Sequence, residues 1–206
     1  MKNKIKLLIM LIIAVFSLVG IGYAAEIEQQ KMDLPNVAVL YVNNGKTTYD
    51  KEIDQSVLGN LAKCIPSNRY NYLSGESYLD KLGQMGITDI STAERGDIID
   101  AFADSAVDYV VFVEVQPFVV RDKFTLFSLG KDVSTVVPLK IIDLTNKKYL
   151  YNGKFTEKAS ASTVFGGLGN KSVALKAIEK INKEIEKVLS TRLPLNKPVF
   201  DSTVKK

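Results

Sequence analysis

Residues 108–115, DYVVFVEV, form the strongest strand pattern in the sequence, and Pro117 ends it. A second run, VAVLYV at residues 37–42, is continuously apolar and rich in β-branched and aromatic residues. A run of this kind predicts a strand that is buried on both faces, because a strand with one solvated face would alternate with polar residues. Helices between such strands imply parallel pairing. The two runs therefore predict an α/β fold.

The segment between the two runs predicts three helices and one further strand. The expected ranges are 51–64 (helix), 69–73 (strand), 77–84 (helix) and 91–106 (helix). In the first helix, Ile53, Val57 and Leu61 share one face, and Pro66 stops the pattern. The capping-box spacing of Ser91-Thr92-Ala93-Glu94 opens the third helix.

After an irregular stretch, the sequence predicts two more strands and a last helix. The expected ranges are 133–143 and 148–160 for the strands and 171–191 for the helix. Pro138 cannot donate a ladder hydrogen bond, so the first of these strands should be an edge strand or carry a bulge. A turn around Thr145–Lys147 joins the strands, and Asn146 is a residue that tolerates positive φ. On the outer face of the helix, Glu179 and Lys183 are spaced for an i,i+4 ion pair.

The order of these elements predicts one mixed-sheet α/β domain. We expect five strands, parallel in the N-terminal part and an antiparallel meander in the C-terminal part. Helices flank the sheet, and a C-terminal amphipathic helix completes the domain. The expected boundaries are 25–36 for a polar tether, 37–193 for the domain and 194–206 for a flexible tail.

The first residues have the pattern of an export signal. Lys2, Lys4 and Lys6 precede a long apolar run, and Gly22-Tyr23-Ala24 offers small residues at a signal-peptidase site. We therefore interpret residues 1–24 as a signal peptide of a periplasmic or cell-surface protein. The apolar run is close to the length of a membrane span, so an uncleaved anchor is the alternative, and only then would the protein contact a membrane.

Composition excludes several functions. The sequence has no histidine, which rules out Ser-His-Asp triads and histidine-ligated zinc sites. Its one cysteine, Cys64, ends a predicted helix and is expected to pack as a small hydrophobe. Three of the 27 basic residues lie in the signal peptide, so the remaining chain has 24 against 23 acidic residues and is close to neutral; the basic residues do not cluster, and we expect no nucleic-acid partner.

The glycine-rich stretch VFGGLGNKSVALKAI, residues 164–178, looks at first like a phosphate-binding loop. A P-loop would need glycine at the positions of Phe165 and Asn170, and the dinucleotide pattern meets Ser172 instead of its third glycine. We interpret the stretch as a sharp turn into the last helix, with Asn170 or Ser172 as its N-cap. The sequence thus predicts no nucleotide and no other cofactor.

Several of these segments resemble a known group of bacterial envelope proteins. AVDYVVFVEV and VPLKIIDLTNKKYLYNGKF resemble the periplasmic α/β domain of CsgG-like curli secretion proteins, of the TolB N-terminal domain, and of outer-membrane lipoproteins that activate penicillin-binding proteins. Asp108-Tyr109 keeps the end of one group motif, and Asp143 and Thr145 keep the second, with Asn146 where glycine is common. Unlike many members, this chain has no cysteine near the cleavage site. The resemblance implies the group's fold and a role in the cell envelope.

The candidate site is the stretch FVVRDKFTLFSLGKD, residues 118–132. It carries four apolar residues without clear periodicity, Phe124, Leu126, Phe127 and Leu129. They either fold back onto the core or form an exposed patch, and such patches usually mark a partner site. We therefore expect an exported, non-enzymatic domain that binds another envelope protein and supports surface assembly or transport; a homo-oligomer is also compatible with the sequence.

The alternative function is an extracytoplasmic small-ligand-binding protein or a hydrolase that uses carboxylates such as Glu114 and Asp143. A deep pocket with convergent polar groups would favour this alternative, whereas a filled core with an apolar surface patch would favour the protein binder.

The export signal makes the first testable prediction. Because Gly22-Tyr23-Ala24 satisfies a signal peptidase, the protein isolated from its native host should begin at or near Ala25. N-terminal sequencing checks this result. A membrane-bound protein that still carries Met1 would instead establish the uncleaved anchor.

Overall fold

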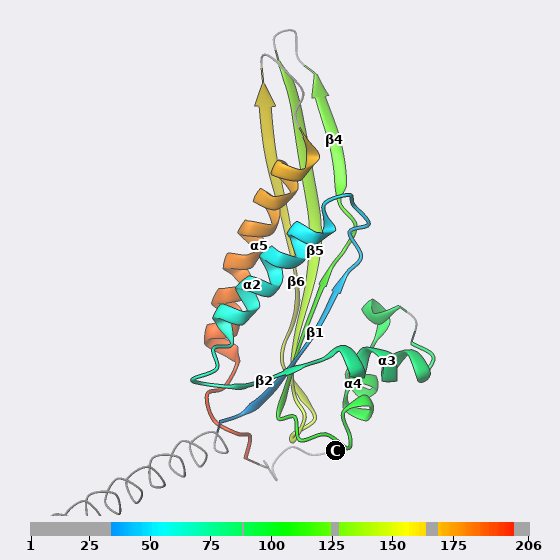
Figure 1. Ribbon diagram of the computed structural model, residues 1–206, viewed down its shortest axis with the longest axis vertical. Coiled ribbons are helices and arrows are strands. Elements are labelled where there is room, and N and C mark those ends of the chain that lie inside the picture. The colour runs from blue at the N-terminus through cyan, green and yellow to red at the C-terminus, as the bar shows by residue number, and fades with distance from the viewer. Residues whose placement is uncertain (1–33, 88, 125–127, 164–168, 200–206) are drawn as a thin grey trace, which may run out of the picture. The chain divides into compact units, whose positions relative to one another are not determined.

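The computed structural model describes residues 34–87, 89–124, 128–163 and 169–199 (Figure 1). The chain divides into two units, Met1–Leu34 and Pro35–Lys206, and the sheet belongs to the second. The predicted signal peptide and most of the predicted tether lie outside the described residues. Within the described ranges, no helix is both long and apolar enough to cross a membrane.

The domain is built on one mixed sheet, as the sequence predicts. Its N-terminal part is parallel, because β1 pairs in parallel with strands on both of its edges. Its C-terminal part is antiparallel around β5. The six strands are β1 (Asn36–Asn43), β2 (Asn71–Ser74), β3 (Tyr109–Val115), β4 (Val119–Phe124), β5 (Leu129–Asp143) and β6 (Lys148–Thr163). The strand order is β2-β1-β3-β5-β4, and β6 also pairs with β5.

The sheet has one strand more than the five expected. The additional strand is β4, in the stretch that the sequence analysis takes as irregular. Every residue of β4 is exposed, so neither face carries the apolar pattern that reveals a buried strand. Backbone pairing with the first residues of β5 holds it in place.

Strand β5 is the centre of the antiparallel part rather than one of its edges. It pairs with β6 on one side, and on the other it pairs first with β4 and then, from Leu139, with β3. Pro138 lies between the β4-paired and β3-paired segments, where its missing N–H interrupts neither ladder. The expectation of an edge strand at Pro138 is therefore wrong. The register does shift nearby, between Ile141 and Ile142, in the ladder with β6.

Helices cover both faces of the parallel part of the sheet (Figure 1). One face packs against α2 (Asp50–Cys64) and α5 (Asn170–Arg192), which bury residues such as Ile53 and Ile178 against the strands. The other face packs against α3 (Glu76–Gln84) and α4 (Arg95–Ala101), which bury Leu82 and Ile98. All seven residues of β3 are buried between the two layers. The predicted pair Glu179–Lys183 is present on α5, with its charged atoms 3.7 Å apart.

Helix α4 begins later than expected. The side chain of Asp89 accepts hydrogen bonds from the N–H and the hydroxyl of Ser91, and residues Ile90–Thr92 form a single 3-10 turn. The capping box is shifted to Glu94 and Asp97, and the helix ends at Ala101. The earlier spacing fails as a cap because the N–H of Glu94, which Ser91 would have to accept, donates to Asp97 instead.

Two other local expectations need correction. In the β5–β6 turn, Lys147 and not Asn146 has positive φ, while Asn146 donates from its backbone and its side chain to Asp143. The N-cap of α5 is Gly169 and not Asn170 or Ser172, so no side chain caps the helix, and the Ser172 hydroxyl donates to the carbonyl of Gly169.

The contact between β2 and β1 yields the second prediction. Gly75 follows β2, and a Cβ at this position would meet the carbonyl oxygen of Val39 and, at 2.8 Å, a methyl carbon of Leu40. Gly75→Ala should therefore lower the free energy of unfolding by about 1–3 kcal/mol. Gly59 is the matched control, because it is exposed within α2 and a Cβ there meets nothing within 4 Å. Gly59→Ala should raise the free energy of unfolding by about 0.5–1 kcal/mol. Urea unfolding measures both variants, and an equal change in the free energy of unfolding for the two would contradict the prediction.

Candidate functional site

The candidate site lies on the hairpin of β4 and β5. Phe124 ends β4 and stands directly opposite Leu129, the first residue of β5. Their relative exposures are 77% and 48%, so the alternative in which these side chains fold back onto the core is wrong for both. The other two candidates, Leu126 and Phe127, lie outside the described residues.

Strand alternation assigns the exposed apolar residues to faces. Val120 pairs with Val133, which is buried in the cluster that α5 covers, so Val120 lies on the α5 side of the hairpin. Phe124 lies four residues after Val120 on β4, and Leu129 lies four residues before Val133 on β5. Because side chains alternate along a strand, Phe124 and Leu129 lie on that same side. We call Val120, Phe124 and Leu129 the hairpin patch. In Figure 1 the strands of the hairpin continue beyond the N-terminal turn of α5, where the helix no longer covers them.

Charged side chains accompany the patch. Asp122 and Lys131 are cross-strand partners on the same side and form an ion pair at 3.3 Å. An apolar centre with a charged rim is the usual composition of a protein-binding surface, since the apolar residues supply burial energy and the charges set orientation.

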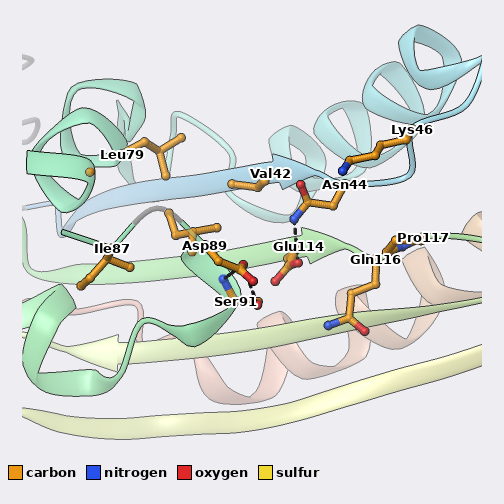
Figure 2. A pocket seen from close by; sticks show the side chains of 12 residues that line it. Val42, Asn44, Lys46, Leu79, Ile87, Asp89, Ser91, Glu114, Gln116 and Pro117 are labelled. Atoms are coloured by element: carbon orange, nitrogen blue, oxygen red, sulfur yellow. Dashed lines mark hydrogen bonds between the residues drawn. The ribbon is translucent and has the colours of Figure 1, made fainter.

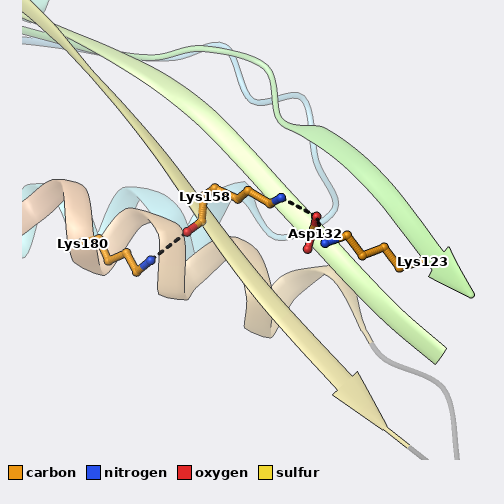
Figure 3. Close-up of polar contacts among 4 residues, drawn as sticks. All are labelled: Lys123, Asp132, Lys158 and Lys180. Carbon is orange, nitrogen blue, oxygen red and sulfur yellow. Dashed lines mark hydrogen bonds and ion pairs between the residues drawn. The ribbon is translucent and has the colours of Figure 1, made fainter. Parts of the chain in front are cut away.

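The opposite side of the hairpin is held by a buried carboxylate (Figure 3). Asp132 is 3% exposed and pairs with Lys123 of β4 at 2.7 Å and with Lys158 of β6 at 2.5 Å. One acidic side chain of β5 is thus linked to β4 and to β6. Lys180 of α5 donates to the carbonyl oxygen of Lys158 at 2.8 Å, and this hydrogen bond connects the helix to β6.

This arrangement shifts the titration of Asp132. The Lys123 ammonium that donates to Asp132 holds the pKa of that carboxyl well below its usual range, and Lys158 and Ser160 act in the same direction. The ionised carboxylate therefore stabilises the hairpin.

Val120 and the Asp132 cluster belong to the site but were not predicted from the sequence. The available signal was the segment VVRDKF, in which Val120, Asp122 and Phe124 alternate with Val119, Arg121 and Lys123. Charges fall on both sides of this strand, so hydrophobic alternation alone does not reveal it.

The two carboxylates of the hydrolase alternative do not share a site. Asp143 pairs with Tyr109 at the start of β3, whereas Glu114 lies five residues further along that strand, on the order of 17 Å away. Asp143 also accepts two hydrogen bonds from Asn146 of the adjoining turn, which gives it a structural role. Across the described residues, no cluster of three or more metal-ligating side chains forms.

Cys64 is half-buried at the end of α2 and packs against the α2–α5 core, as expected. Burial raises the pKa of its thiol to about 11, so the thiolate form that reacts or binds metal is disfavoured at neutral pH.

Comparisons with known proteins give likenesses of structure only. No protein-family model matches the sequence, and no curated protein matches it. A hemagglutinin homolog from Helicobacter pylori, described as putative neuraminyllactose-binding, is 14% identical, with a TM-score of 0.47 over 77% of this chain and 87% of its own. Lipoprotein GNA1162 from Neisseria meningitidis is 13% identical, with a TM-score of 0.39 over 73% and 98%. The LpoB C-terminal domain from Salmonella enterica is 12% identical, with a TM-score of 0.34 over 60% and 82%.

Lipoproteins are thus among the solved structures to which this chain shows a likeness. The link to curli secretion proteins stays a prediction.

The Asp132 cluster yields the third prediction. Since the folded pKa of Asp132 lies below the unfolded value of about 3.9, its stabilising contribution is present above that pH and is lost as the pH falls through the folded value. Asp132→Asn should therefore lower the free energy of unfolding at pH 7 and make progressively less difference below about pH 4. Denaturant unfolding at several pH values measures this difference. The control is Asp122→Asn, which removes an exposed ion pair and should change stability little at any pH.

Proposed function

We propose that this protein is an exported, non-catalytic component of the cell envelope that binds another envelope protein through the hairpin patch and supports surface assembly or transport. The export signal predicted from residues 1–24 supports the compartment. The observation that carries the binding function is the exposure of Phe124, an aromatic residue at the paired end of β4.

The energetics favour a protein partner. Burying a Phe or Leu side chain completely gains about 1.5–3 kcal/mol, so Phe124 and Leu129 together can serve as the centre of an interface. Both are held in register by backbone pairing, which lowers the entropy lost on binding. The patch is therefore preorganised for a partner with a complementary apolar surface.

The free edge of β4 favours recognition through side chains. In the described part of the chain, β4 has a partner strand only on its β5 edge. Arg121, Asp122 and Lys123 occupy its middle, and charges on an edge strand oppose indiscriminate pairing with other strands. A partner that binds here must match this pattern of charge, which supplies specificity.

A non-catalytic role fits the positions of the acidic residues. The carboxylates of the hydrolase alternative, Glu114 and Asp143, lie near opposite ends of β3 and cannot act on one bond. Asp132 is already bound by two lysines. We therefore assign no catalytic residue.

The fourth prediction tests the patch directly. Phe124→Ser combined with Leu129→Ser should leave the thermal midpoint nearly unchanged, because both side chains are exposed, while capture of the envelope partner falls at least tenfold. The experiment compares proteins crosslinked to wild type and variant in envelopes of the native host, quantified by mass spectrometry.

Val119→Ser is the matched control, since Val119 is 52% exposed on the same strand but lies on the opposite side. It should retain the partner that the double variant loses. If both variants retain it, the hairpin patch is not the interface; if the crosslinked species is a second copy of this chain, the patch is a self-association surface and the proposed partner is wrong.

A further inference from the structure

A cavity of about 700 Å³ lies at the carboxyl ends of the parallel strands β1 and β3, beside α3 (Figure 2). Its walls are partly apolar, with Val42 from β1, Leu79 from α3 and Ile87 from the following loop. Polar side chains, including Asn44 and Glu114, line it from the strand ends. The carboxyl ends of parallel strands are where α/β proteins commonly bind small molecules, and the volume suits one.

Glu114 is the unusual residue of this cavity. It lies in the fully buried strand β3 and is only 2% exposed. Its Oε1 accepts a hydrogen bond from Asn44 Nδ2 at 2.9 Å, but its Oε2 has no hydrogen-bond partner among the described residues. A carboxylate can accept about four hydrogen bonds, so most of its capacity is unused. Burial of such a group costs stability, and its presence at a cavity wall indicates a ligand that donates.

The neighbouring lysines do not supply a hydrogen-bond donor to Oε2 of Glu114. Lys140, on the same face of the sheet, donates from Nζ to the carbonyl oxygen of Ala93 at 2.7 Å. Burial lowers the pKa of Lys140, and the negative charge of Glu114 acts in the opposite direction. Neither Lys140 nor Lys46, which lines the cavity, forms an ion pair with Glu114 within the described ranges.

The charges of the cavity point to a cation. Glu114 and Asp89 contribute two carboxylates to its lining, against one ammonium from Lys46. Asp89 is exposed and accepts two hydrogen bonds from Ser91 at Oδ1, whereas Glu114 is the buried carboxylate of the lining and its Oε2 has no hydrogen-bond partner among the described residues. An anionic ligand would meet the buried carboxylate of Glu114, which forms no ion pair among the described residues, and this disfavours it.

We infer that this cavity binds a small organic cation, a primary ammonium on an apolar body. The ammonium donates to Oε2 of Glu114, and the apolar body packs against Val42, Leu79 and Ile87. A hydrophobic lining with one fixed charge is the usual design of a small-molecule site. This function is independent of the hairpin patch, which lies on the α5 side of the sheet, whereas the cavity lies on the α3 side.

The test compares probes that differ only in charge. Hexylammonium, hexanoate and hexanol are titrated into the isotope-labelled protein, and amide chemical shifts are followed by NMR. Hexylammonium should cause saturable shifts at Val42, Leu79 and Ile87, whereas hexanoate should cause none and hexanol should bind at least tenfold more weakly. This comparison needs no variant, so it decides the proposal even if a variant fails to fold.

Two substitutions have opposite expected effects. Glu114→Gln removes the charge but keeps the shape, and it should weaken hexylammonium binding at least tenfold. Lys46→Met removes a cation that competes with the ligand, and it should strengthen binding severalfold. The double serine variant of the hairpin patch should bind hexylammonium as the wild type does.

Three results would overturn the inference. The first is the absence of saturable shifts with hexylammonium, which would show that Oε2 of Glu114 does not serve a cationic ligand. The second is equal binding of hexanoate, and the third is binding by Glu114→Gln that matches the wild type. None of these results bears on the hairpin patch.

Discussion

The change of partner along β5 is the constraint on which the rest of the domain depends. One edge of this strand pairs with β6 throughout, while the other passes from β4 to β3 at Pro138. A residue without an N–H fits this junction because neither ladder needs a donor there. The sheet therefore consists of a part with helices on both faces and a hairpin part that only α5 partly covers.

The two parts are stabilised by different interactions. Around β3, burial of apolar side chains on both faces supplies the stability, and all of its residues are buried. Strand β4 of the hairpin is exposed throughout, and backbone pairing and the Asp132 cluster hold this strand in place of apolar packing. A strand held by its backbone and by charges can present apolar side chains to a partner, because the fold does not need to bury them. Phe124 is exposed for this reason.

The elements that the sequence predicts well are those whose apolar pattern determines their burial. β1, α2, β3 and α5 agree closely with expectation, because their apolar residues follow the period of the structure they form. β4 was missed because its charges lie on both sides and its stability comes from strand pairing that no local pattern records. For the same reason the exposure of Phe124 could only be stated as one of two alternatives. The unpaired oxygen of Glu114 depends on where Asn44 and Lys140 donate, which the sequence does not specify.

The segment that joins the cavity to the hairpin determines whether the two sites can influence each other. Gln116 and Pro117 line the cavity and lead directly into β4. The backbone of Gln116 is fixed to β5 twice, since its N–H donates to Val136 at 3.0 Å and its carbonyl accepts from the Thr135 hydroxyl at 2.7 Å. Thr135 is itself buried, so this connection cannot shift without disturbing the core. A ligand beside Glu114 would thus meet a rigid wall, and the hairpin patch would keep its geometry whether or not the cavity is filled.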